Sequence, residues 1–148
     1  MGDGSPAIIG ETIAGRVIPD DTWGILCIFA EARGEPYEGQ VAVGCVIRNR
    51  CARRFYSDGT VVDTVTKPHQ FSWMNTGDGQ RTRVLRVDRS DPAWKIAARA
   101  WFESAHVRLV DDAVFYHADY VAPYWSKSQG IDFVKRIGRH LFYREGDK

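Results

Sequence analysis

The sequence is poor in the features that mark a strongly charged binding protein or a membrane protein. Twenty Lys and Arg residues are balanced by 19 Asp and Glu residues, so the formal net charge is only +1. This balance gives no bulk attraction to nucleic acid or to an anionic membrane surface. No apolar run approaches the ~20 residues of a membrane-spanning helix. We therefore expect neither nucleic-acid binding nor membrane insertion.

Cysteine is also scarce, and its pattern argues against a disulfide-stabilised protein and against a cysteine-dependent enzyme. The three cysteines are an odd number without a C-x-x-C pair, so a disulfide framework is not expected. All lie in helical, apolar contexts that do not suit a thiol nucleophile. His117, Asp119 and His140 raise the possibility of a metal site, but no H-E-x-x-H or Cys/His cluster accompanies them. The sequence predicts no metal and no cofactor.

The organisation of the chain is simple, without an internal repeat or interdomain linker. At 148 residues the chain is long enough to bury a hydrophobic core without disulfide bonds or a structural metal. Its 44% hydrophobic and 26% charged residues are typical of a globular protein. Residues 1–20 hold Gly, Ser, Pro and Asp around a brief apolar patch, and they are predicted to be an N-terminal extension. Residues 21–145 are predicted to form one domain.

Three helices are predicted from caps and apolar spacing. The first begins within residues 20–22 and ends near Arg33, because Gly34 is a natural helix terminator. The second starts at Pro36 and runs toward Arg50, with small residues that would let another backbone approach closely. The third covers residues 91–105 and opens with an Asp-Pro pair.

The remaining segments are predicted to be a long excursion and a small sheet. Residues 55–90 contain β-type runs at 60–65 and 84–87 but are expected to have little regular structure of their own, as functional loops often do. Residues 113–117 indicate a strand, and two short runs around Gly138-Arg139 indicate a hairpin. Helices followed by an antiparallel sheet predict an α+β fold.

Glu31 is the first candidate for chemistry, because it lies in the last turn of the first predicted helix. The partial negative charge at that helix end and apolar neighbours such as Phe29 should raise the pKa of its carboxyl group. A carboxyl that keeps its proton near neutral pH can protonate the leaving group in glycosidic cleavage. The spacing equally permits a surface ion pair with Arg33 or Arg48.

Glu35 and Glu38 place two more carboxylates within the same eight residues. Most glycosidases use a pair of carboxylates. However, Glu35 precedes Pro36 at the start of the second predicted helix, where acidic residues offset the helix dipole. We expect a structural or substrate-binding role for Glu35 rather than a second catalytic role.

The residues around Glu31 resemble the signature of the SleB-like cell wall hydrolases, which include spore-cortex-lytic enzymes and phage or bacterial wall hydrolases. The similarity begins with EARGEPYEGQ at 31–40 and continues to residue 50. It extends in order to PHQFSW at 68–73, FYHADY at 115–120 and RIGRHLFY at 136–143. With these four motifs in the family's order, the resemblance spans roughly residues 23–144, nearly the whole predicted domain.

The resemblance implies a lysozyme-like or lytic-transglycosylase-like fold, peptidoglycan glycan strands as partner, and Glu31 as the catalytic residue. It implies cleavage between N-acetylmuramic acid and N-acetylglucosamine. Glu31 would protonate the leaving oxygen and then accept the proton of the muramic C6 hydroxyl, which closes a 1,6-anhydro ring. The alternatives are muramidase-type hydrolysis to a reducing end and a non-catalytic peptidoglycan-binding module.

The aromatic-rich motifs are the expected substrate subsites. Aromatic rings offer flat surfaces for sugars, and polar side chains can bind sugar substituents, although some of these rings could instead belong to the core. Neighbouring residues alternate in facing along a strand, so only one of Tyr116 and His117 should face the cleft. The candidate substrate-binding residues are Glu35, Gln70, Phe71, Ser72, Trp73, Tyr116, His117, Tyr120 and Tyr124.

The expected setting is that of an endolysin. Residues 1–14 lack the basic start and continuous apolar core of a secretory signal peptide. We therefore expect a monomer that is made in the cytoplasm and acts on the cell wall after release or export.

Overall fold

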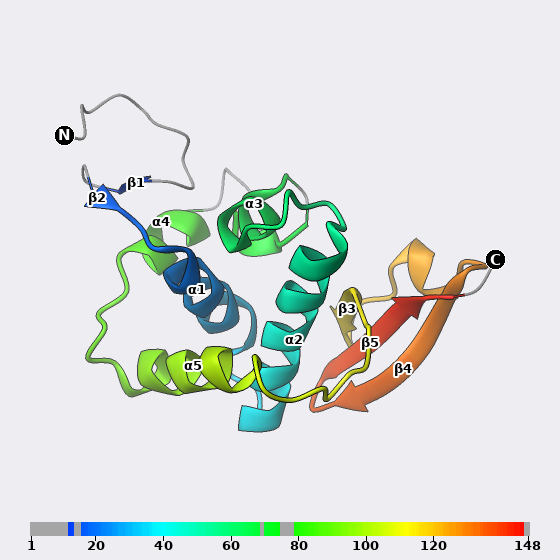
Figure 1. Ribbon diagram of the computed structural model, residues 1–148. Coiled ribbons are helices and arrows are strands. Elements are labelled where there is room, and N and C mark those ends of the chain that lie inside the picture. Colours follow the sequence, from blue (N-terminus) through cyan, green and yellow to red (C-terminus); the bar gives the residue numbers. More distant parts are fainter. Residues whose placement is uncertain (1–11, 14–15, 69, 75–78, 147–148) are drawn as a thin grey trace.

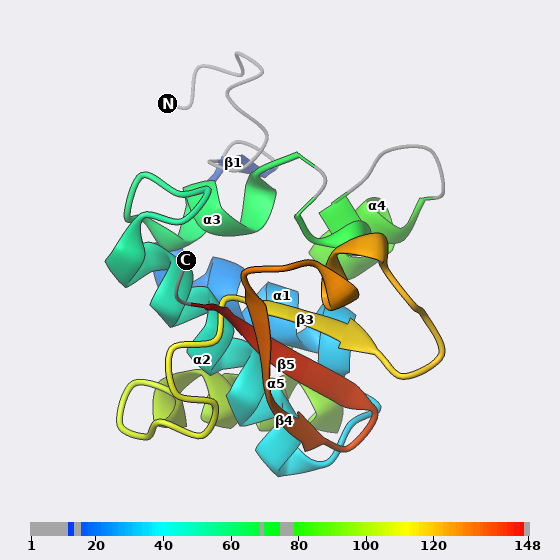
Figure 2. The same ribbon diagram turned by 90° about the vertical axis from the view of Figure 1, so that its right-hand side faces the viewer.

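Helices and sheet occupy separate parts of the molecule in the computed structural model, which describes residues 12–13, 16–68, 70–74 and 79–146. Three long helices, α1 (Asp20–Ala32), α2 (Tyr37–Arg53) and α5 (Pro92–Glu103), form the helical part. The sheet lies on the side of α2 away from α1 and α5 (Figures 1 and 2). The predicted α+β fold is confirmed.

The predicted N-terminal extension lies partly outside the described residues. Its described part contains β1 (Thr12–Ile13) and β2 (Arg16–Val17), which pair in antiparallel orientation. Helix α1 begins at Asp20, within the predicted range of residues 20–22.

The long helices begin and end close to the predicted residues. Asp91 caps α5, since its carboxylate accepts a hydrogen bond from Ala93 N at 2.8 Å. The packing of α1 and α2 against the end of α5 depends on two glycines, at positions where a side chain would not fit. A Cβ on Gly24 would lie 2.6 Å from the Trp101 ring, and one on Gly44 would lie 2.7 Å from Ser104 Oγ. On the second helix, side chains of Ser104 and Ile28 fill the space beside Gly44, and the expected approach of another backbone stays a prediction.

The prediction of little regular structure in residues 55–90 is wrong. This segment contains α3 (Val61–Thr66), a 3-10 turn η1 (Ser72–Met74) and α4 (Gln80–Leu85), so both β-type runs contribute to helices. At α3, capping by Thr60 overrides the β-branched composition.

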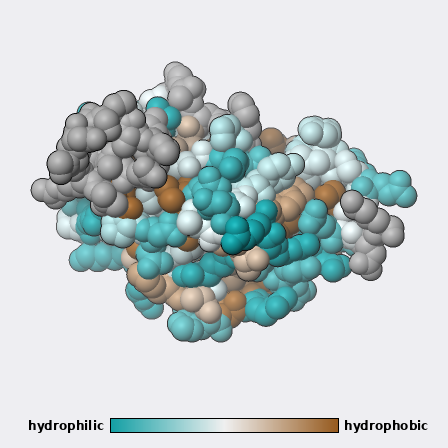
Figure 3. All heavy atoms as spheres, turned by 45° about the horizontal axis from the view of Figure 1, so that its top comes forward, coloured by the Kyte–Doolittle hydropathy of each residue, from teal (hydrophilic) through white to brown (hydrophobic). Residues whose placement is uncertain are grey.

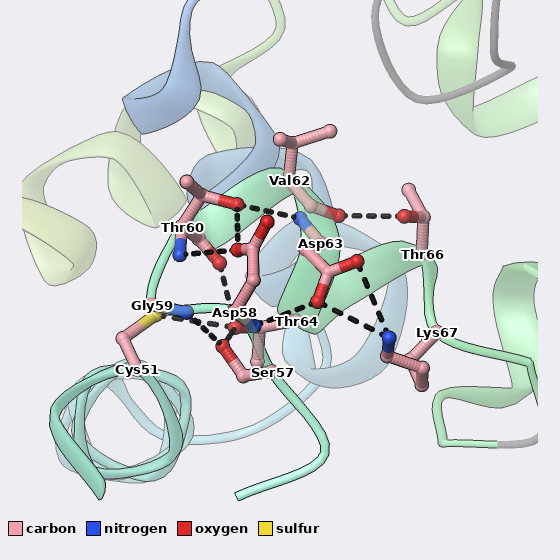
Figure 4. Close-up of polar contacts among 10 residues, drawn as sticks. All are labelled: Cys51, Ser57, Asp58, Gly59, Thr60, Val62, Asp63, Thr64, Thr66 and Lys67. Carbon is pink, nitrogen blue, oxygen red and sulfur yellow. Dashed lines mark hydrogen bonds and ion pairs between the residues drawn. The ribbon is translucent and has the colours of Figure 1, made fainter. Parts of the chain in front are cut away.

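Figure 4 shows the start of α3, where the Thr60 hydroxyl accepts a hydrogen bond from Asp63 N at 3.2 Å. The Asp20 carboxylate of α1 also accepts from Val61 N and Val62 N, at 2.9 and 2.7 Å. These contacts satisfy backbone donors that a helix leaves free at its N-terminus. The contacts of Asp20 could not be predicted from the segment alone, because Asp20 is distant in sequence, whereas the Thr60 cap is local.

The sheet has the strand order β3-β5-β4 and is antiparallel. It consists of β3 (Phe115–Ala118), β4 (Ile131–Ile137) and β5 (His140–Glu145), with a second 3-10 turn, η2 (Tyr124–Lys127), between β3 and β4. The β4–β5 hairpin turns at Gly138, which has a φ of +58°. This confirms the predicted hairpin.

The two faces of the sheet have different surroundings. Tyr116 and its register partner Phe142 point to the helical core, and Phe142 is fully buried. Phe115 and His117 point the other way, where both contact Trp125 of η2. This alternation decides which residues of β3 can reach α1.

The molecular surface is predominantly hydrophilic on the face shown in Figure 3, where apolar residues form separate small patches. Among the described residues, every helix is too short or too polar to cross a membrane.

Candidate active site

Glu31 lies where α1, η1 and β3 meet. The Tyr116 hydroxyl donates to Glu31 Oε1 at 2.7 Å, and the Ser72 hydroxyl donates to Glu31 Oε2 at 3.2 Å. Each oxygen of the carboxyl group therefore has a hydroxyl partner from a different element. Three segments that are distant in sequence build this one site.

Burial raises the pKa of the Glu31 carboxyl group above its ordinary value. Hydrogen bonds from Tyr116, Ser72 and the Trp73 backbone and the positive charge of Arg50 act in the opposite direction, but burial has the larger effect. The group is thus better able than an ordinary glutamate to hold a proton toward neutral pH.

The interpretation of Glu31 as a partner in a surface ion pair is wrong. Arg33 Nη1 donates to the backbone oxygen of Phe29 at 3.0 Å, within its own helix. Arg48 is directed toward α5, where it donates to Ser104 Oγ and to the backbone oxygen of Trp101, both at 2.8 Å. Both arginines are engaged away from the carboxyl group.

Tyr116 is held as a hydrogen-bond donor. Burial and the neighbouring Glu31 carboxylate raise the pKa of its phenol well above the ordinary value. Its ring packs against Phe71, His140 and Phe142, with centroid distances of 6.4, 5.0 and 5.7 Å. Packing therefore fixes the direction in which the hydroxyl points.

The cysteines are inert in this setting. Cys27, next to the site on α1, is fully buried, and burial followed by the charge of Glu31 raises its thiol pKa well above the ordinary value. Burial also raises the pKa of the Cys45 and Cys51 thiols. All three are free thiols that resist conversion to the nucleophilic thiolate.

Glu35 is used by the fold. Its Oε1 atom accepts a hydrogen bond from Arg139 N at 2.8 Å, which ties the start of α2 to the β4–β5 turn. A Cβ on Gly138 would collide with that same oxygen. The expected structural role matches this contact, whereas a substrate contact by Glu35 remains a prediction.

Two of the four predicted substrate-binding residues in the motif at 68–73 are buried in the core. Phe71 and Trp73 are 2% and 0% exposed, so neither offers a ring face to a sugar, and their assignment as sugar platforms is corrected. Gln70 is half-buried and accepts a hydrogen bond from Arg50 at 3.0 Å. Ser72 is exposed and contacts Glu31. His69 lies outside the described residues.

His117 is separated from Glu31 by the sheet. Its Nε2 atom lies 2.8 Å from the Tyr143 hydroxyl, and its ring stacks on the Tyr143 ring on the outer face. The predicted alternation is confirmed, because Tyr116 and His117 point to opposite faces of the sheet and only Tyr116 contacts Glu31. His117 is therefore removed from the set of residues around Glu31. That Tyr116 faces a substrate cleft stays a prediction.

Tyr120 and Tyr124 follow β3 and are 80% and 91% exposed. Both rings are exposed enough to stack on a sugar, and their role in substrate binding stays a prediction. Among the described residues, no group of three or more His, Cys, Asp or Glu side chains is placed to hold a metal ion.

Sequence reasoning missed Arg50, which is 5% exposed and lies between the segments that carry Ser72 and Tyr116. Its position on α2 is the one feature of the sequence that could have identified it. Arg50 follows Val46 by one helical turn, on the side where Val46 is buried. An arginine on an apolar face indicates a buried polar contact.

A model of the cell wall hydrolase family matches residues 34–143. The chain belongs to this family. The resemblance seen in the sequence and the prediction of an enzyme are thus confirmed. The matched range begins after Glu31, so the role of Glu31 rests on other observations.

Two curated relatives of the cell wall hydrolase are spore cortex-lytic enzymes. The one from Oceanobacillus iheyensis is 32% identical over 125 residues, which cover 78% of this chain and 38% of that protein. The one from Bacillus subtilis is 32% identical over 118 residues, which cover 78% of this chain and 34% of that protein. The chain therefore spans little more than a third of the length of these relatives.

Solved structures support the fold. The catalytic domain of the germination-specific lytic transglycosylase SleB from Bacillus anthracis has a TM-score of 0.67 at 24% identity, and the match covers 88% of this chain and 98% of that one. The SleB catalytic domain from Bacillus cereus has a TM-score of 0.65 at 25% identity, with 83% and 88% covered. The predicted lytic-transglycosylase-like fold is confirmed.

Proposed function

We propose that this cell wall hydrolase cleaves peptidoglycan glycan strands between N-acetylmuramic acid and N-acetylglucosamine, as a lytic transglycosylase with Glu31 as its one acid–base residue. The observation that carries the proposal is the Glu31 carboxyl group at the end of α1. It has a raised pKa and a hydroxyl donor on each oxygen. The Bacillus anthracis domain of similar fold is that of a lytic transglycosylase, which supports the same reaction.

In the proposed reaction, Glu31 first acts as an acid. It gives its proton to the glycosidic oxygen while the bond from that oxygen to the anomeric carbon breaks, and N-acetylglucosamine leaves as an alcohol. The Tyr116 and Ser72 hydroxyl groups donate to the carboxylate that remains, which stabilises its charge.

Glu31 then acts as a base. Its carboxylate removes the proton of the muramic C6 hydroxyl, and the C6 oxygen bonds to the anomeric carbon, so a 1,6-anhydro ring closes. The carboxyl group ends protonated, as it began, and no water is consumed. A second carboxylate is not required, which agrees with the use of Glu35 by the hairpin turn.

Analysis of the products tests the reaction. Purified protein is incubated with isolated sacculi and with spore cortex peptidoglycan, and the soluble products are identified by mass spectrometry. Anhydro-muropeptides are expected. Muropeptides with reducing-end muramic acid would instead establish muramidase chemistry, free peptides would reject glycan cleavage, and binding without solubilisation would indicate a non-catalytic module.

Substitution of Glu31 tests the assignment of the residue. Glu31→Gln keeps the size and the acceptor oxygen of the side chain but cannot deliver the proton, so activity should fall roughly 100- to 10,000-fold. Glu38→Gln is the matched control, because Glu38 is an exposed carboxylate in the first turn of α2. Wild-type activity in Glu31→Gln would reject the assignment.

We also propose an endolysin setting, on the basis of the resemblance to phage lysins. The protein would be a monomer that accumulates in the cytoplasm and acts on the wall after release or export. Expression in a bacterial host with and without a membrane-permeabilising protein tests the route, since lysis should require permeabilisation. Sedimentation velocity tests the monomeric state.

A further inference from the structure

Arg50 carries a buried positive charge inside the scaffold of the site. It lies in the last turn of α2 and is 5% exposed. In the part of the chain that the structure describes, none of the ion pairs involves Arg50. Burying a charge without a carboxylate partner is costly, so its other contacts must compensate.

Those contacts are two directed hydrogen bonds and two ring faces. Arg50 Nε donates to the backbone oxygen of Val114 at 2.7 Å, and Nη1 donates to Gln70 Oε1 at 3.0 Å. The guanidinium carbon lies 5.1 Å from the Phe71 ring centroid and 5.6 Å from that of Phe55. A guanidinium group offers donors in a rigid planar fork, which suits this double contact.

Each hydrogen-bond partner of Arg50 lies close along the chain to a hydrogen-bond partner of Glu31. Gln70 lies two residues before Ser72, and Val114 lies two residues before Tyr116. We propose that Arg50 is the positioning residue of the site, because it joins these two segments and so sets the Ser72 and Tyr116 hydroxyl groups on the Glu31 carboxyl group. This inference rests on the proposed function for the role of Glu31.

The charge of Arg50 supports the same role. It lowers the pKa of Glu31, against the larger effect of burial. Tyr116 from β3 and Cys27 from α1 also interact with Glu31, and both have pKa values well above the ordinary range. They remain neutral where Glu31 titrates, whereas η1 contributes the uncharged Ser72 and Trp73. Arg50 is the cation that opposes the effect of burial on Glu31.

The test compares Arg50→Gln and Arg50→Lys with Arg48→Gln. Arg48 is a matched control, because its side chain also donates two hydrogen bonds and stacks on an aromatic ring, that of Trp101. Its contacts join α2 to α5 and not to the segments around Glu31. For each variant, kcat and KM on soluble glycan strands are measured across pH, and thermal unfolding is measured in parallel.

Arg50→Gln should lower kcat about 100-fold, the scale expected when reacting groups are misplaced by about 1 Å. It should also move the alkaline limb of the kcat/KM profile to higher pH, because removal of the positive charge raises the pKa of Glu31. Arg50→Lys keeps the charge but not the planar fork, so kcat should fall while the limb stays in place. Arg48→Gln should lose stability with a wild-type pH profile.

Equal effects of Arg50→Gln and Arg48→Gln on kcat and on the pH profile would overturn the inference. If Arg50→Gln does not fold, Gln70→Met replaces it, because this change removes one contact of Arg50 and keeps the charge. Gln70→Met should lower kcat without moving the limb, and an unchanged kcat would overturn the inference. Wild-type activity in Glu31→Gln would instead reject the proposed function itself.

Discussion

The Tyr116 hydroxyl donates a hydrogen bond of 2.7 Å to Glu31 Oε1 across a separation of 85 residues in the sequence. The contact couples the end of α1 to the face of β3 that points into the core. It lowers the pKa of Glu31 and stabilises the carboxylate form. Under the proposed mechanism, this bond should influence both the acid and the base step.

Tyr116→Phe should therefore raise the pKa of Glu31 further and move the alkaline limb of the kcat/KM profile to higher pH. The maximal rate should fall, because the carboxylate formed after proton transfer loses a donor. Tyr143→Phe is the control, since its hydroxyl lies 2.8 Å from His117 on the outer face of the sheet. A pH profile of Tyr116→Phe that matches wild type would contradict the proposed role of this hydrogen bond.

Glu31→Gln should change how stability depends on pH. The folded protein holds the Glu31 proton more tightly than the unfolded chain, because burial raises the folded pKa. The resulting stabilisation is complete below the unfolded pKa of about 4.3 and is lost as pH rises through the folded pKa. Urea unfolding should show Glu31→Gln gaining stability relative to wild type between pH 4 and pH 8. A difference that does not vary with pH would contradict this.

Gly138→Ala should destabilise the hairpin and its contact with α2. The residue has a φ of +58°, and a Cβ there would collide with Glu35 Oε1. The left-handed conformation alone costs about 1–2 kcal/mol for a residue with a side chain. Gly34→Ala is the control, because a Cβ at Gly34 would have no atom within 4 Å. Thermal unfolding of both variants checks the prediction, and equal midpoints would refute it.

Tyr124→Ala should raise KM for glycan strands while kcat changes little, if the exposed ring is a sugar platform. Phe102→Ala is a suitable control, since Phe102 is an exposed aromatic residue on α5, away from the segment after β3. Steady-state kinetics on strands of defined length distinguish the two variants. An unchanged KM in Tyr124→Ala would remove this residue from the predicted subsites.

Chelation and thiol alkylation should leave activity intact. The proposed reaction uses a carboxyl group, and burial raises the thiol pKa of Cys27, Cys45 and Cys51. Activity is measured after incubation with a chelator and, separately, with an alkylating reagent under native conditions. Loss of activity with either treatment, at unchanged stability, would contradict a reaction carried by the carboxyl group alone.

Local sequence patterns were sufficient for the long helices and the hairpin. Asp91 and Pro92 specify the start of α5, because the Asp91 side chain caps the backbone only two residues further along the chain. Gly138 specifies the turn through its own backbone conformation. These patterns were not sufficient at α3. The β-branched composition of that segment favoured a strand, whereas the local Thr60 cap and the contacts of Asp20, which is distant in sequence, favour a helix.

The sequence by itself determined that a carboxyl group stands in the last turn of a helix, and it identified the family through four ordered motifs. Only the tertiary structure decided which residues surround Glu31. Strand pairing turned Tyr116 inward and His117 outward, and core packing buried Phe71 and Trp73. The physical reason is that burial and hydrogen bonding depend on segments folded together, whereas capping and turn formation depend on neighbours along the chain.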